Sequence, residues 1–122
     1  MTPEEIDALL SAAQEHNQMG RYAETEALLR PWIKTADAHN NPEQHVRALN
    51  VLSSAIAIRG HASEALSLAE QAVELATTLP AEVAPELIAR ALTCVGDCHS
   101  KLSDFPLALD YFQRALAQNE EH

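Results

Sequence analysis

Apolar residues recur along the chain with the spacing of amphipathic helices, and short interruptions divide the pattern into six segments. Two segments open with a good helix-capping residue, Thr2 or Asn41, followed by proline in the first helical position. Glu5 and Gln44 complete capping-box patterns, in which a side chain early in the helix bonds back to the cap. The pattern predicts helices over residues 3–18, 22–38, 43–59, 62–78, 85–101 and 105–119.

The helix boundaries repeat at a nearly constant interval. Pro-Glu dipeptides that open a helix begin, 39 and 43 residues apart, at Pro3, Pro42 and Pro85. A glycine or serine that ends one helix and leads into the next recurs at Gly20, Gly60 and Ser103. We therefore expect a single domain over 1–122, built from three helix–turn–helix units at about 3–38, 43–78 and 85–119.

Composition supports an all-α fold, because hydrophobic residues make up 47% of the 122 positions and aromatic residues only 4%. Residue size also repeats between the units. Small residues align at Ala13, Ser53 and Gly96, and large apolar residues align at Leu9, Leu49 and Leu92. Small residues at facing positions allow two antiparallel helices to approach closely.

The third unit has the most complete pattern, Leu92, Val95, Gly96 and His99, followed by Ala108, Phe112 and Ala115. This pattern resembles the tetratricopeptide repeat (TPR) family, in the long-period subclass of about 40–43 residues seen in bacterial regulators. The resemblance implies three antiparallel hairpins stacked as a right-handed superhelix. It also implies a non-catalytic protein–protein interaction module without a cofactor, as in the TPR region of a bacterial signalling protein. We expect the chain to be the N-terminal part of such a protein, with any catalytic domain outside it.

The charge balance narrows the class of partner. The chain has 18 acidic and 8 basic side chains, a net charge of −10, and no third of it is basic. This balance disfavours nucleic acid and anionic membranes and leaves a protein or a peptide as the expected partner. No apolar run approaches the roughly 20 residues that span a bilayer, and no secretory signal is visible. We therefore expect a cytoplasmic location.

Two thiols and an imidazole lie close together at Cys94, Cys98 and His99. The cysteines share one helix face, but His99 points about 100° away from Cys98, and zinc sites need three or four ligands. The spacing predicts no metal site and favours two buried or half-buried thiols that pack as small apolar groups. A metal or thiol site at Cys94 and Cys98 is the second alternative function.

The first helices of stacked hairpins line one concave side, and a polar stripe follows that side here. The stripe of the first unit is Asp7, Leu10, Gln14 and Gln18. The residues expected to form a partner-binding groove are Gln14, Arg47, Asn50, Ser54, Arg90, Thr93, Asp97 and Lys101. In this hypothesis Arg47 and Arg90 grip a ligand carboxylate, and Asn50 and Gln14 hydrogen-bond an extended peptide. The alternative is an ordinary solvated helix face.

The paired Lys and Asn positions of the carboxylate clamp found in some TPR domains are absent, so chaperone C-terminal tails are not expected as ligands. A second surface lies at the end of the chain. Leu109, Phe112 and Leu116 on the last helix are expected to leave apolar area uncovered, which typically marks an interaction site. A self-associating scaffold, closed as a homodimer, is therefore the first alternative function.

Overall fold

The computed structural model describes residues 1–121, and within them it contains seven helices and no strand. The helices are α1 (Pro3–Gln18), α2 (Tyr22–Trp32), α3 (Ala36–Asn40), α4 (Pro42–Ile58), α5 (Ala62–Ala76), α6 (Ala84–Lys101) and α7 (Phe105–Glu121). None of these helices combines the length and the apolar character needed to cross a bilayer. The predicted all-α class is confirmed.

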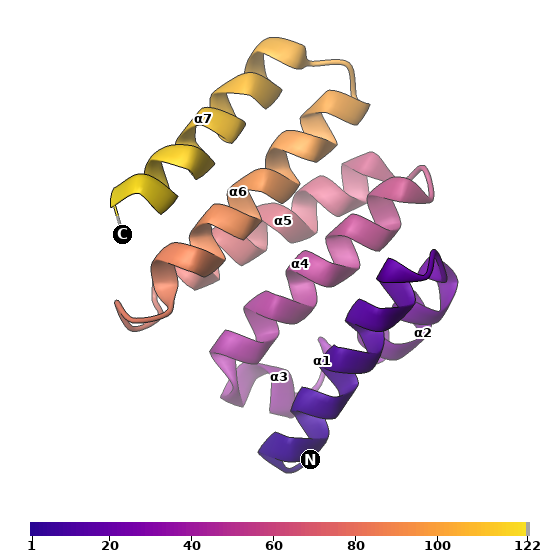
Figure 1. Cartoon of the computed structure of the whole chain (residues 1–122). Helices are drawn as coiled ribbons and strands as arrows, with labels where there is room; N and C mark the ends of the chain where they lie inside the picture. Colours follow the sequence, from indigo (N-terminus) through magenta and orange to yellow (C-terminus); the bar gives the residue numbers. More distant parts are fainter. Residues whose placement is uncertain (122) are drawn as a thin grey trace.

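The long helices form three hairpins, α1–α2, α4–α5 and α6–α7, which stack side by side (Figure 1). The first helices of the hairpins, α1, α4 and α6, form one layer, and α2 and α5 lie behind it. Helix α7 packs on α6 at the edge of the stack opposite α1. This arrangement places the three polar stripes of the first helices in one layer.

The three hairpins turn through the same backbone motif. Gly20, Gly60 and Ser103 have φ angles of 76°, 93° and 66°, so each occupies the left-handed conformation at its helix end. The N–H of the next residue then bonds to a carbonyl five residues earlier, for example from Arg21 to His16 at 2.7 Å. A helix end of this kind, closed by two backbone hydrogen bonds, is the Schellman motif, which glycine favours. The recurrence predicted from the sequence therefore has one physical cause, although Ser103 adopts the strained conformation without being glycine.

The predicted helix over 22–38 is wrong, because α2 ends at Trp32 and a separate short helix, α3, follows. Pro31 lies in the last turn of α2 and lacks the N–H that continues a helix. Thr35 then starts the new helix: its hydroxyl accepts from the N–H of Ala38 at 3.4 Å and donates to the Trp32 carbonyl at 2.6 Å.

One of the two predicted capping boxes forms. Thr2 accepts from the N–H of Glu5 at 3.1 Å, and the Glu5 carboxylate accepts from the N–H of Thr2 at 2.9 Å. Asn41 makes no such cap, which corrects the second prediction. Its amide instead donates to the Asp37 carbonyl at 2.8 Å, because α3 ends immediately before α4 begins.

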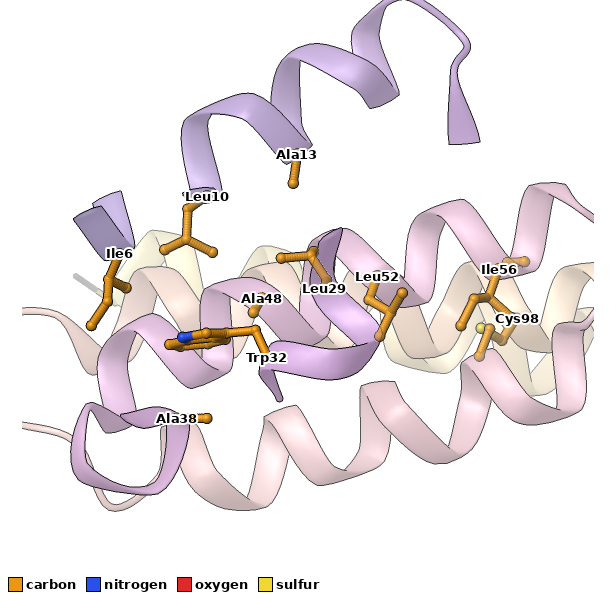
Figure 2. Packing of buried hydrophobic residues seen from close by; sticks show 12 residues of the cluster. Ile6, Leu10, Ala13, Leu29, Trp32, Ala38, Ala48, Leu52, Ile56 and Cys98 are labelled. Carbon is orange, nitrogen blue, oxygen red and sulfur yellow. The ribbon is translucent and has the colours of Figure 1, made fainter. Parts of the chain in front are cut away.

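Buried side chains between the helices form two clusters. The first joins α1, α2 and α4, reaches Cys98 of α6, and includes Ile6, Leu29, Trp32 and Leu52 (Figure 2). The second joins α4, α5 and α6 and includes Val46, Leu49, Ala72 and Leu87. These clusters fix the spacing of α1, α4 and α6, and with it the shape of the layer that carries the polar stripes.

The aligned small residues lie where the two helices of each hairpin approach closely. The type of contact differs from one hairpin to the next. The Thr25 hydroxyl oxygen lies 3.2 Å from the Ala13 carbonyl oxygen in the first hairpin, and the Ser53 hydroxyl donates to the Ala65 carbonyl at 2.8 Å in the second. In the third hairpin, the Phe112 ring occupies the space beside Gly96. A β-carbon added to Gly96 would lie 2.6 Å from Cε1 of Phe112, so the contact requires glycine.

Candidate interaction groove

A surface hollow of about 580 Å³ lies across α1, α4 and α6. Its lining is Gln14, Asn17, Gln18, Asn50, Val51, Ser54, Arg90, Thr93, Cys94 and Asp97. Six of the eight predicted groove residues therefore come together, because the repeat places equivalent positions of the three helices in one layer. Arg47 and Lys101 are not in this lining, and Leu10 of the predicted stripe is 5% exposed and belongs to the core.

Asn50 is the most unusual residue of the hollow. It is only 7% exposed, and neither its side-chain nitrogen nor its side-chain oxygen has a hydrogen-bond partner in the protein. Most buried polar groups in proteins are paired, and an unpaired one costs about 1–3 kcal/mol. Asn50 is therefore an unpaired donor and acceptor in the wall of the hollow, and because the protein covers both atoms, the side chain must turn toward the hollow to meet a ligand.

Asn17 fixes the wall of the hollow, and the sequence analysis missed it. Its side-chain nitrogen donates to the Val51 carbonyl at 3.0 Å, and its side-chain oxygen accepts from the Thr25 hydroxyl at 2.7 Å. One amide thus links α1 to α4 and to α2. Its position three residues after Gln14, on the same helix face, was the available signal.

The two arginines expected to grip a carboxylate are already paired within their own helices. Arg47 lies 3.3 Å from the carboxylate of Glu43, and Arg90 lies 3.0 Å from that of Glu86. Both glutamates precede the arginine by four residues, a favourable helical spacing. An acidic ligand would have to compete with these intrahelical ion pairs.

Asp97 is the other charged residue of the lining, and it differs from Arg90. Among residues 1–121, the Asp97 carboxylate forms no ion pair and no side-chain hydrogen bond. Partial burial raises the pKa of the Asp97 carboxyl, while the positive charge of Lys101 works in the opposite direction. Both residues line a smaller adjoining hollow of about 100 Å³. Asp97 thus presents a partly desolvated, unpaired carboxylate to the groove.

The thiols of α6 are packed as small side chains, as predicted. Cys98 is buried and Cys94 is half-buried, with its Sγ 3.8 Å from both the Asn50 carbonyl oxygen and the Ser54 hydroxyl. Burial raises the pKa of Cys94 to about 11 and also raises that of Cys98, so both thiols are neutral near pH 7. The ring of His99 stacks on Tyr111 of α7 at 5.4 Å.

Within residues 1–121, no group of three or more His, Cys, Asp or Glu side chains is placed to hold a metal ion. The neutral thiols and the absence of a third nearby ligand in that range give the metal or thiol alternative no support from geometry.

The outer face of α7 carries exposed apolar side chains. Phe105, Leu109 and Leu116 are 61%, 56% and 60% exposed, and we refer to these three residues as the α7 stripe. Two of them were predicted, and Phe105 was missed because it opens the helix. Phe112 is half-buried against Gly96, which corrects its placement on the uncovered surface.

No protein-family model matches the chain, and no curated protein matches it. Among solved structures, the crystal structure of the TPR domain of Arabidopsis FLU is similar, with a TM-score of 0.81 and 16% sequence identity. The alignment covers 98% of this chain and 98% of that one. At this identity the likeness establishes the fold alone, and it confirms the resemblance drawn from the repeat pattern: the chain folds as a TPR domain.

Proposed function

We propose that this protein is a non-catalytic interaction module, and that the hollow across α1, α4 and α6 binds an extended peptide segment of a partner protein. The observation that carries the proposal is Asn50, a buried amide whose donor and acceptor are both unpaired in the protein. A peptide group offers one acceptor and one donor, which an Asn side chain can match with two hydrogen bonds.

The shape of the hollow suits such a ligand. Its volume of about 580 Å³ falls within the usual range for binding pockets and accommodates a few residues of extended chain. Gln14, Gln18 and Thr93 add polar groups from the two neighbouring helices. The fold supports the same function, because stacked helical hairpins present an extended concave surface suited to binding.

In the fuller form of the proposal, the chain is the TPR region of a cytoplasmic bacterial signalling or regulatory protein. The long repeat period is what supports this step. In that setting the bound segment would belong to a signalling partner, and any catalytic output would come from a separate domain.

The test is selection of 12-residue peptides from a random phage library on the immobilised protein, followed by affinity measurements on synthetic peptides. We expect Asn50→Ala to weaken binding at least tenfold, since two hydrogen bonds of about 1 kcal/mol each are lost. Asn50→Ala should leave the fold intact, because the side chain makes no hydrogen bond within the protein.

The matched control is Gln71→Ala, which removes an exposed amide from α5. Unchanged affinity in Asn50→Ala, with circular dichroism showing a folded protein, would refute the proposed site.

A second candidate function, self-association, is favoured by the α7 stripe. Phe105, Leu109 and Leu116 follow one another at spacings of four and seven residues, which places them along one side of the helix. Asp110 and Arg114, which lie on the same helix, are 4.0 Å apart and carry opposite charges, so this pair adds no net charge to the surface of α7. We propose an antiparallel α7–α7 homodimer, in which Leu109 of one chain meets Leu116 of the other.

Sedimentation equilibrium tests the dimer. The wild-type protein should show a concentration-dependent mass, and Leu109→Glu together with Leu116→Glu should give a monomer at every concentration. Ser67→Glu together with Gln71→Glu, two exposed positions on α5, is the control. A wild-type protein that stays monomeric into the high micromolar range would exclude self-association through this surface.

A further inference from the structure

We propose that the hollow selects basic peptides: the Asp97 carboxylate receives a lysine or arginine side chain, while Asn50 holds the neighbouring main chain. This inference rests on the proposed peptide-binding function and specifies the chemistry of its ligand.

The first argument is the charge that the hollow leaves uncompensated. Its lining contains two charged residues, Arg90 and Asp97. The Arg90 guanidinium is compensated by Glu86 at 3.0 Å, whereas Asp97 makes no ion pair among residues 1–121. The uncompensated charge of the lining is therefore negative, and a cationic group is the ligand chemistry that complements it.

The second argument is the environment of Asp97. Asp97 is exposed, but it lies in the wall of the hollow, and the neighbouring protein removes enough water from its carboxylate to raise the pKa. A cation that docks there restores the lost solvation, and the interaction is stronger than on the open surface because the local dielectric constant is lower. Asp97 is thus better suited to bind a cation than a fully hydrated surface aspartate.

Lys101 is the internal competitor for the same carboxylate. It follows Asp97 by four residues on α6 and attracts it, but the two do not form an ion pair in the structure. A ligand cation would share Asp97 with Lys101 or displace it. Removing the Lys101 charge should therefore strengthen the binding of a basic peptide, which a merely structural role for Lys101 would not explain.

The third argument is Asn50, an independent sign that the hollow is built for a ligand. Its amide has no partner in the protein, and Asn50 lines the same hollow from α4 as Asp97 does from α6. An extended peptide advances about 3.3 Å per residue and points successive side chains to opposite sides. A main chain held by Asn50 can therefore direct one side chain toward α6, where Asp97 lies.

Acidic peptides are the less favourable ligand on the same observations. Arg47 and Arg90 would have to leave Glu43 and Glu86 to bind an acidic group. The chain as a whole carries a net charge of −10, which slows the approach of an anionic partner and speeds that of a cationic one.

The experiment uses the phage-selected 12-residue peptides described above. We expect lysine and arginine to be enriched at one position. For a synthetic peptide with lysine there, Asp97→Asn should weaken binding roughly fivefold, the scale of a partly exposed ion pair. The same peptide with norleucine at that position should bind wild type and Asp97→Asn equally. Lys101→Gln should tighten binding of the lysine peptide. The control is Glu74→Gln, which neutralises an exposed carboxylate on α5.

The outcomes separate this inference from the proposed function. Selected peptides that require Asn50 but show no basic enrichment, and that bind Asp97→Asn as well as wild type, would overturn the inference alone. Peptides that bind independently of Asn50, or a library that yields no binder, would overturn both.

Discussion

Helices α5 and α7 are equivalent members of successive repeats, but residues at equivalent positions differ in burial between the two helices. Positions 62, 66, 69 and 73 of α5 correspond to positions 105, 109, 112 and 116 of α7. The α5 residues Ala62 and Ala69 are buried, whereas Phe105 and Leu109 of α7 are more than half exposed. The repeat therefore determines which residues face the next layer, and the presence of a neighbouring helix determines whether they become core or surface.

Residue size differs in the same way between the two faces. Helix α5 has alanine at positions 62 and 69, while α7 has phenylalanine at both equivalent positions. Phe112 turns this difference into a local contact, because it fills the space that Gly96 leaves open on α6. The last hairpin is thus joined by a ring against a glycine, and its outer stripe is exposed.

The largest effect on stability should come from filling the space beside Gly96. Gly96→Leu forces the Phe112 ring away, and overpacking of this kind typically lowers the free energy of unfolding by up to about 3 kcal/mol. Urea denaturation followed by circular dichroism measures the change. Adding Phe112→Ala to Gly96→Leu should recover part of the loss, since it frees the contested volume. An unchanged midpoint in Gly96→Leu would show that α6 and α7 are not packed in this register.

A pair of identical substitutions tests the comparison itself. Leu66 of α5 and Leu109 of α7 hold equivalent positions, but Leu66 packs against the core and Leu109 is 56% exposed. Leu66→Ala should lower the free energy of unfolding by about 1–2 kcal/mol, and Leu109→Ala by less than about 0.5 kcal/mol. Both are measured at a concentration where the protein is monomeric. Equal losses would mean that the two faces do not differ in burial.

The smallest expected effect is on the labelling rate of Cys94, whose thiol lies in the hollow. With a pKa of about 11, Cys94 is almost entirely protonated at pH 8, and its thiolate fraction rises about tenfold per pH unit up to that value. Labelling of the folded protein by iodoacetamide should therefore be slow at pH 8 and accelerate with pH. The Cys94→Ser variant, which retains only the buried Cys98, should label more slowly still. Rapid labelling of Cys94 at pH 7 would contradict the raised pKa and would support a function for this thiol.

Much of the fold follows from local patterns. The repeat of proline, glycine and small residues predicted the hairpins because each hairpin uses the same Schellman turn. The break after Trp32 escaped prediction, because Pro31 ends a helix only in combination with the Thr35 cap that follows. The missing cap at Asn41 was not predicted for a related reason: its side chain donates to a carbonyl of α3 instead of capping α4.

The positions of the groove residues could be predicted from the sequence, but the partners of their side chains could not. Periodicity placed Gln14, Asn50 and Asp97 on one surface, and in the structure they line the same hollow. Periodicity does not indicate that Arg90 is neutralised by Glu86 or that Asn50 has no partner, since both depend on side-chain conformation and on packing between helices. The pairing of Arg90 with Glu86, together with the unpaired Asp97, is what led us to propose a basic ligand in place of an acidic one.

The most direct test of peptide binding in the hollow is NMR titration of the ¹⁵N-labelled protein with a selected lysine-containing peptide. The side-chain amide resonances of Asn50 should move most, together with backbone signals of Ser54, Thr93 and Asp97, while α5 and the outer face of α7 stay unchanged. Shifts concentrated on Leu109 and Leu116, with Asn50 unaffected, would contradict the groove and make the α7 stripe the interaction surface.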